Sequence, residues 1–215
     1  MDYLLKSLSV LMSYPGPAMR AALPEVRAIV AHQPALLALT DELIAMDPFD
    51  AEERYVGLFD RSRQLSLNLF EHIHGESRDR GSAMVDLIET YRAAGFDPVT
   101  SELPDHLPVL LEFLASRPAA EVKEVLAGAA HVLGALAERL TRRDSAYAAV
   151  PAFLLRLAGA EGGTLPDEVD ENPDDLAALD AIWAETEVTF GPDPNAGCPA
   201  AREVLTRMDL PMTAE

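Results

Sequence analysis

Apolar residues recur every three or four positions through most of the first 160 residues, the spacing that gathers them on one face of an α-helix. The first stripe is Leu4, Leu8, Leu11 and Met12, and Pro15-Gly16-Pro17 stops it. Further stripes are Leu23, Val26, Ile29 and Val30; Leu36, Leu37, Thr40, Leu43 and Ile44; Tyr55, Val56 and Phe59; Leu65, Leu69, Phe70 and Ile73; Met84, Leu87, Ile88 and Tyr91; Leu107, Leu110, Leu111 and Leu114; Val122, Val125, Leu126, Ala129, Val132, Leu133, Leu136 and Leu140; and Tyr147, Val150, Phe153, Leu154 and Leu157. No run alternates apolar and polar residues, so the sequence predicts an all-α fold, a single helical-bundle domain.

Capping residues predict where several of these helices begin and end. Asp50 starts a capping-box pattern, and Ser77 is a predicted N-cap. Gly95 is the predicted C′ residue of the helix that follows Ser77. Asp105 is the predicted N-cap of the next helix, which places Pro108 at its third position, where no helical N–H bond is lost.

The composition changes after residue 160. Residues 1–160 are the predicted helical domain, whereas residues 161–215 hold 14 acidic and 2 basic residues together with six prolines. This balance predicts an acidic, partly disordered tail. One helix is expected near residues 173–187, with Pro173 in its first turn. That helix either stays in solvent or docks on its own domain or on a partner.

Charge narrows the class of partner. Apolar residues make up 49% of the 215 residues, enough for a core, and the formal net charge is −19. Such a charge argues against nucleic acid and anionic membranes and favours a basic partner segment. Cys198 is the single cysteine, and neither a signal peptide nor an apolar run of about 20 residues is found. We therefore expect a cytoplasmic protein.

The charged run from Glu71 to Gly81 holds residue types that also occur in metal sites. His72 and His74 are two positions apart and so do not share a helix face. No metal or cofactor is expected, and no glycine-rich phosphate loop supports nucleotide binding. A metal-dependent hydrolase that uses His72, His74 and His106 is the alternative of another class. Arg78 and Arg80 lie near a helix N-terminus, which the helix dipole does not favour, so we expect them to pair with carboxylates or bind a ligand.

The segment Glu102-Leu103-Pro104-Asp105-His106 places a proline, an acid and a histidine at the start of a helix. Pro104 restricts the approach, Asp105 is an acid, and His106 projects from the first turn. One interpretation is a well-built loop-to-helix junction. The other is the rigid rim of a groove that binds a peptide. The residues alone leave both open.

Several runs of the chain form a recognisable pattern when they are taken together. They are Leu67 to Met84, Glu102 to Pro108, Leu111 to Leu114, Tyr55 to Asp60, Val188 to Phe190 and Ala196 to Cys198. This pattern resembles the NarJ-type assembly chaperones of respiratory nitrate reductase. The Pro-Asp-His element alone is shared with the wider TorD-like redox enzyme maturation chaperones.

The resemblance implies a TorD-like helical chaperone and not an enzyme. Such proteins bind the apo catalytic (alpha) subunit of a membrane-bound molybdenum nitrate reductase through its N-terminal segment. They hold that subunit competent for insertion of the molybdenum cofactor, which the chaperone itself need not bind. A chaperone for another molybdoenzyme is the alternative. The residues predicted to contact the client peptide are Glu102, Pro104, Asp105, His106, His72, His74, Arg78, Arg80, Tyr55, Phe59 and Phe70.

Overall fold

The computed structural model describes residues 2–61, 63–74, 77 and 79–162. The chain divides into two units, Met1–Asn172 and Pro173–Glu215, and the second lies outside the described residues. The predicted acidic tail, except its first two residues, and its helix near 173–187 therefore lie outside the described residues too. Within the described ranges, no helix is long and apolar enough to cross a bilayer.

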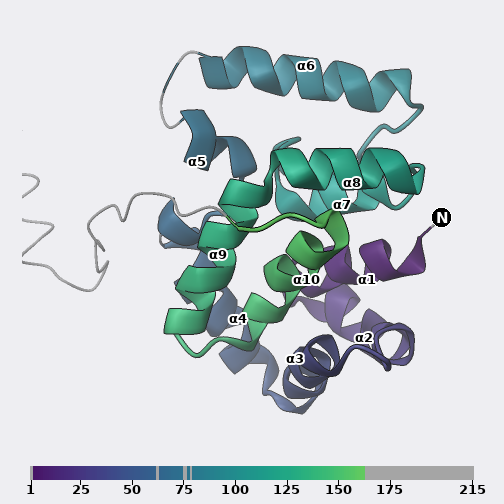
Figure 1. The fold of residues 1–215 in the computed structure, drawn as a ribbon. Helices are drawn as coiled ribbons and strands as arrows, with labels where there is room; N and C mark the ends of the chain where they lie inside the picture. Colours follow the sequence, from purple (N-terminus) through teal and green to yellow (C-terminus); the bar gives the residue numbers. More distant parts are fainter. Residues whose placement is uncertain (1, 62, 75–76, 78, 163–215) are drawn as a thin grey trace, which may run out of the picture. The chain divides into compact units, whose positions relative to one another are not determined.

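The described part of the chain is helical, as the apolar spacing predicts, and its one β-feature is an isolated bridge between Asn68 and His106. A π-helix, η1, covers Val56–Asp60, and two short 3₁₀ helices, η2 and η3, cover Arg63–Leu65 and Ala146–Ala148. The α-helices (Figure 1) are α1 Tyr3–Leu11, α2 Pro17–Ile29, α3 Pro34–Ala45, α4 Pro48–Tyr55, α5 Leu69–His74, α6 Asp79–Ala93, α7 Leu107–Leu114, α8 Ala119–Gly128, α9 Ala130–Arg142 and α10 Ala149–Ala158.

Proline and aspartate set several helix starts. Asp2 caps α1, because its carboxylate accepts from the N–H groups of Leu4 and Leu5 at 2.9 and 3.2 Å. The prediction that Asp50 caps α4 is wrong, since Asp47 is the N-cap and accepts from the Phe49 N–H at 2.9 Å. Pro48 then occupies the first turn, where its missing N–H costs no helical bond.

Two predicted boundaries had different outcomes. Gly95 ends α6 as expected: its φ is +73°, and the Phe96 N–H returns to the Tyr91 carbonyl at 2.9 Å. The long stripe from Val122 to Leu140 is not one helix. It is divided between α8 and α9 at Ala129, whose φ and ψ of −90° and 4° leave the helical region just after Gly128.

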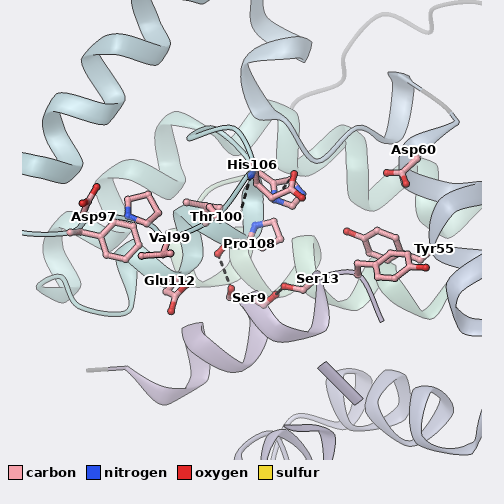
Figure 2. Close-up of a pocket in the computed structure, with 15 residues that line it drawn as sticks. Ser9, Ser13, Tyr55, Asp60, Asp97, Val99, Thr100, His106, Pro108 and Glu112 are labelled. Atoms are coloured by element: carbon pink, nitrogen blue, oxygen red, sulfur yellow. Dashed lines mark hydrogen bonds and ion pairs between the residues drawn. The ribbon is translucent and has the colours of Figure 1, made fainter. Parts of the chain in front are cut away.

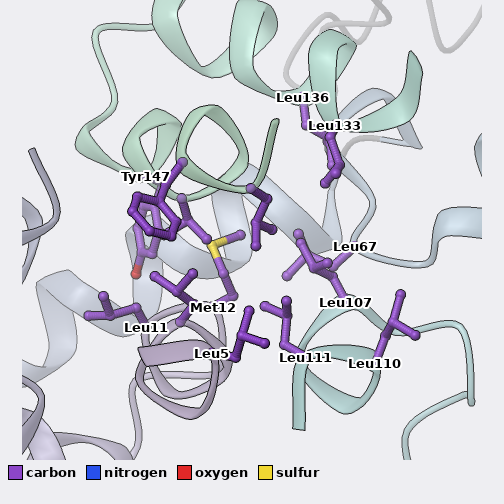
Figure 3. Close-up of a cluster of buried hydrophobic side chains, with 14 of the residues drawn as sticks. Leu5, Leu11, Met12, Leu67, Leu107, Leu110, Leu111, Leu133, Leu136 and Tyr147 are labelled. Carbon is purple, nitrogen blue, oxygen red and sulfur yellow. The ribbon is translucent and has the colours of Figure 1, made fainter. Parts of the chain in front are cut away.

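The core is built around the antiparallel packing of α1 on α7. The Asp2 N–H donates to the Ala115 carbonyl at 2.6 Å at one end of this seam. Ser9 Oγ donates to the Pro108 carbonyl at 2.7 Å at the other. Figure 3 shows the leucines that fill the space between them and continue toward α9 and Tyr147. These fully buried side chains dominate the stabilisation of the unit.

Candidate functional site

Asp105 joins two segments that lie 35 residues apart in the sequence. Its Oδ2 accepts from the Phe70 N–H at 2.9 Å, at the start of α5. Its backbone carbonyl accepts from the Leu69 N–H at 3.1 Å, and the Leu107 N–H donates to the Leu67 carbonyl at 2.8 Å. The loop before α5 is thereby fixed to the loop before α7.

The prediction that Asp105 is the N-cap of its own helix is therefore wrong. His106 is the N-cap of α7, and Pro108 lies at the second helical position instead of the third. The Asp105 carboxylate is 1% exposed and is used by the distant N–H of Phe70. Asp105 therefore caps α5 and not α7. Tertiary packing brings the first N–H groups of α5, which have no partner within their own helix, within reach of this buried carboxylate.

Buried polar atoms gather behind this joint. Burial raises the pKa of the Asp105 carboxyl, while the Phe70 N–H and the nearby Arg80 guanidinium oppose that shift. Among the described residues, Asp105 Oδ1, Asn68 Oδ1 and Arg80 Nε lack a hydrogen-bond partner. The joint is thus a polar cluster enclosed by protein.

Tyr91 holds the ends of the loop that leads to this element. Its ring packs on Phe96 and Phe113, with centroids 5.4 and 4.6 Å away, and its hydroxyl donates to the Pro104 carbonyl at 2.7 Å. Tyr91 is the single residue of α6 that is buried. Residues 97–103, here called the 97–103 loop, therefore leave and rejoin the core at one tyrosine.

A groove of about 720 Å³ lies beside the 97–103 loop (Figure 2). Part of its floor is the seam between α1 and α7, where Ser9 donates to the carbonyl of Pro108. Its volume lies within the roughly 300–1,000 Å³ of typical ligand pockets. The lining residues are Ser9, Ser13, Tyr14, Tyr55, Asp60, Phe96, Asp97, Pro98, Val99, Thr100, Glu102, His106, Pro108, Val109 and Glu112.

A π-helix forms one end of the groove. Helix α4 continues without a break into η1, whose last residue, Asp60, lines the groove beside Tyr55. The Tyr55 hydroxyl donates to the Met12 carbonyl at 3.0 Å, and its ring packs on Phe59 at 4.9 Å. Short π-helical turns often occur at functional sites, because they redirect side chains at the end of an α-helix.

His106 lies in the middle of the groove wall in Figure 2. Its side chain is 14% exposed, and its Nδ1 lies 4.0 Å from Glu102 Oε2. Burial lowers the pKa of the His106 imidazole, whereas the carboxylates of Glu102, Asp105 and Asp60 act in the opposite direction. Nδ1 is buried and has no hydrogen-bond partner among the described residues. Burial thus disfavours the charged form of the ring, and Nδ1 is a buried polar atom left to satisfy.

The groove contains three of the residues predicted from the sequence, namely Tyr55, Glu102 and His106. Pro104 lines a smaller adjoining hollow of about 190 Å³, which also includes Glu102 and Tyr91. Asp105 is absent from the lining of both hollows and lies in the joint behind them. Asp105 therefore belongs to the junction between loop and helix, whereas Glu102 and His106 line the groove, whose binding of a peptide stays a prediction.

The other predicted residues lie away from the groove lining. Phe59 is in the core, and Phe70 stacks edge-on against His74 at 5.8 Å. His72 Nε2 lies 2.7 Å from the Ser66 carbonyl oxygen. Arg80 is half-buried on α6 near the joint, and Arg78 lies outside the described residues.

The metal-site alternative gains no geometric support from the described residues. Within those ranges, no group of three or more histidine, cysteine or acidic side chains is placed to hold a metal ion. His72 and His74 belong to α5, while His106 faces the groove.

Most of the groove lining was not identified from the sequence. Asp60, Asp97 and Glu112 come from η1, the 97–103 loop and α7, and only the fold brings them to one hollow. Asp60 was within a run that resembles the chaperone family, and that resemblance is the one signal that pointed to it. Ser9 and Tyr14 had no such signal. Ser9 is a small polar residue within the first apolar stripe, and Tyr14 directly precedes the Pro15-Gly16-Pro17 segment that ends the helix.

Comparison with known proteins identifies the family of the chain. The family model described as nitrate reductase delta subunit matches residues 19–153. The chain is 47% identical over 160 residues, 73% of its own length and 68% of the relative's, to the nitrate reductase molybdenum cofactor assembly chaperone NarJ of Escherichia coli K12. It is 37% identical over 200 residues, 91% of its length and 87% of the relative's, to a probable chaperone of the same description, NarW, from that strain.

A solved structure shares the fold. The crystal structure of a redox enzyme maturation protein from Archaeoglobus fulgidus matches with a TM-score of 0.53 and 24% sequence identity, covering 72% of this chain and 90% of that one. The family model spans more than half of the chain, and the relatives extend over most of it. The chain therefore belongs to the nitrate reductase delta subunit family.

Proposed function

We propose that this protein is an assembly chaperone of nitrate reductase. It binds the apo catalytic subunit through the N-terminal segment of that subunit and keeps it competent for insertion of the molybdenum cofactor. The relatives named NarJ and NarW support the class of client. The chaperone acts by binding and not by catalysis, and its proposed compartment is the cytoplasm.

The groove is the observation that carries this proposal. It combines the aromatic ring of Tyr55 with the polar groups of Glu102 and His106 (Figure 2). A groove between helices accepts an amphipathic peptide helix through a few apolar anchors, with polar groups at the rim. Several such contacts together give micromolar or tighter binding.

The joint at Asp105 gives this groove a fixed wall. The carboxylate and the carbonyl of Asp105 both accept hydrogen bonds from α5. These two bonds restrict the backbone position of the adjacent His106. Preorganised walls lower the entropy cost of binding a peptide. The client segment then orders against a surface that is already formed.

The test is calorimetry of the full-length protein with a synthetic peptide from the N-terminus of the apo catalytic subunit. We expect binding with Kd of about 10 μM or tighter. The absence of heat at several times that concentration, with the protein folded by circular dichroism, would reject the proposal. Co-purification from cells that express the nitrate reductase genes identifies the client, and recovery of a different molybdoenzyme would favour the alternative chaperone function.

A further inference from the structure

We infer that residues 163–171 dock along one face of α9, so that the four acids of this run meet a cluster of arginines at the end of that helix. The run follows the described residues directly and belongs to the same unit, Met1–Asn172. The surface lies outside the groove, and its assignment does not rest on the proposed function. Two observations carry it, namely the path on which the chain leaves α10 and the basic side chains at the end of that path.

The chain crosses α9 directly after α10 has ended. Gly159 ends α10 with a φ of +65°, and the Ala160 N–H returns to the Leu155 carbonyl at 3.3 Å. A Cβ placed on Gly162 would lie 2.9 Å from Gly134 Cα, which is too close for a side chain. The backbone at Gly162 is therefore seated directly on α9.

Small side chains continue along α9 from this crossing point. Ala137 and Thr141 follow Gly134 at intervals of three and four residues, which places the three on one side of the helix. Arg142 comes next, at the end of the same side. It lies about 12 Å along the axis from Gly134, at 1.5 Å per residue. This face of α9 therefore offers a path from Gly162 to the end of the helix.

Five arginines gather where this path ends, and two segments supply them. Arg139 is buried, and its Nη1 donates to the Gln64 carbonyl at 2.8 Å, which holds η2 against α9. The arginines that surround this bond, here called the arginine cluster, are Arg61, Arg63, Arg139, Arg142 and Arg143. All but Arg139 are exposed. The cluster contains five of the 17 lysine and arginine residues of the whole chain.

Neighbouring acids offset only part of this charge. The described acids that adjoin the cluster in space or in sequence are Asp60, Glu71, Glu138 and Asp144. Glu71 lies 3.3 Å from Arg63 Nε, and Glu138 lies 4.0 Å from Arg142 Nη2. By contrast, residues 1–160 as a whole contain 22 acidic and 15 basic residues. The arginine cluster is therefore a positive region on an acidic domain, and it attracts negative charge.

The acidic run after Gly162 has the length and the charge to reach the cluster. Its acids are Asp167, Glu168, Asp170 and Glu171. Asp167 is five residues beyond Gly162, and an extended chain spans up to about 16 Å over that length. The path along α9 needs about 12 Å. Exposed ion pairs are weak one at a time, but a short tether keeps the run at high effective concentration beside the arginines.

The first experiment measures how far this docking protects the run from proteolysis in the full-length protein. Glutamyl endopeptidase cleaves after Glu168 and Glu171, and a synthetic peptide of residues 163–175 gives the rate for the same bonds without the domain. We expect cleavage at low salt to be about tenfold slower in the protein than in the peptide, and the difference to disappear at high salt. Equal rates at low salt would overturn the inference and leave the cluster to an anionic partner from outside the chain.

The second experiment removes charge from the cluster. Arg142→Gln with Arg143→Gln should raise the cleavage rate of the run about fivefold. Lys6→Gln with Arg92→Gln removes the same charge from exposed sites elsewhere and should leave the rate within about twofold of wild type. An equal rise in both pairs would mean that net charge, and not the arginine cluster, holds the run. Circular dichroism checks that each variant is folded.

A charge swap tests whether the two groups meet directly. Arg142→Glu with Arg143→Glu should abolish the protection, because like charges now face each other. Adding Asp167→Arg with Asp170→Arg should restore it to within about threefold of wild type, each rate being compared with that of the matching peptide. The swap leaves the cleavage sites after Glu168 and Glu171 in place. Failure of the second change to restore protection would overturn direct pairing.

The third experiment tests the path along α9. Gly162→Ala should lower the protection about threefold, because the new Cβ forces the backbone away from Gly134. Gly128→Ala is the matched control, since a Cβ there meets nothing within 4 Å. Unchanged protection in Gly162→Ala would show that the run does not depend on this crossing and would overturn the path.

Discussion

The two sides of the Glu102–His106 element differ in what surrounds them. Asp105 points into the protein, is 1% exposed, and is bonded to the Phe70 N–H. Glu102 and His106 line the open groove. Neighbouring residues of one short segment therefore hold the fold together on one side and place polar groups along an open groove on the other.

This difference teaches that a conspicuous motif need not act as one unit. A buried acceptor that satisfies a helix N-terminus contributes to the free energy of unfolding, whereas an exposed carboxylate contributes little to it. Substitutions on the two sides should therefore separate stability from binding. The predictions below test that separation, beginning with the largest expected effect.

Asp105→Ala should lower the free energy of unfolding by about 2 kcal/mol, because it leaves the Phe70 N–H without its acceptor in a part-buried site. Urea denaturation followed by circular dichroism measures the change. Asp105→Asn is the matched control, since its amide oxygen can still accept from Phe70, and it should lose less than half as much. A fully stable Asp105→Ala protein that no longer binds the client peptide would show that Asp105 acts at the groove.

Tyr91→Phe should lower the free energy of unfolding by about 1 kcal/mol, because it removes only the hydrogen bond from the hydroxyl to the Pro104 carbonyl. Tyr3→Phe, at a residue that is 63% exposed, is the control and should have no measurable effect. The same denaturation experiment checks both. Limited proteolysis should also cleave the 97–103 loop faster in the Tyr91 variant, and an unchanged rate would contradict its role in holding the loop.

His106→Gln should reduce the loss of stability on mild acidification. Burial lowers the pKa of His106 in the folded protein, so the unfolded chain binds more protons just below its ordinary pKa of about 6.5. This term makes the wild type less stable as the pH falls below that value, by less than about 1.4 kcal/mol per pH unit. Melting temperatures at pH 7.5 and 5.5 compare the two proteins, with the exposed His32→Gln as control. A steeper acid loss in His106→Gln than in wild type would reverse the sign and reject the assignment.

Glu102→Gln should leave the free energy of unfolding within about 0.5 kcal/mol of wild type, because its side chain is 55% exposed and its contact with His106 is 4.0 Å long. Its affinity for the client peptide should nevertheless fall about two- to threefold. Calorimetry and denaturation of the same preparation provide both values. A stability loss comparable to that of Asp105→Ala would remove the distinction between the two sides.

Helix positions could be predicted because apolar spacing is a local property. The stripe through Leu4, Leu8 and Leu11 became α1, and the glycine stop at Gly95 lies where expected. The joint could not be predicted, since an aspartate at a helix entry can serve its own helix or a distant one. Asp105 serves Phe70, and no local pattern encodes that choice.

The groove was only partly predictable for a similar reason. Glu102 and His106 stood out because they lie in an unusual sequence, and Tyr55 because of a family resemblance. Asp97 and Glu112 are ordinary exposed acids in the sequence and acquire meaning only when α7 and the 97–103 loop meet at one hollow. The split between α8 and α9 was missed because a helical stripe continues in phase across the break at Ala129.

The seam between α1 and α7 has a consequence for folding. Ser9 and Pro108 are 99 residues apart, and contacts of such long range form late because the intervening chain must first be ordered. During synthesis, α1 can pack on α2 soon after it emerges, but it meets α7 only after residue 114 has left the ribosome. The floor of the groove does not exist before then. If the proposed function holds, a chain that ends before α7 should not bind the client peptide, because it lacks this floor.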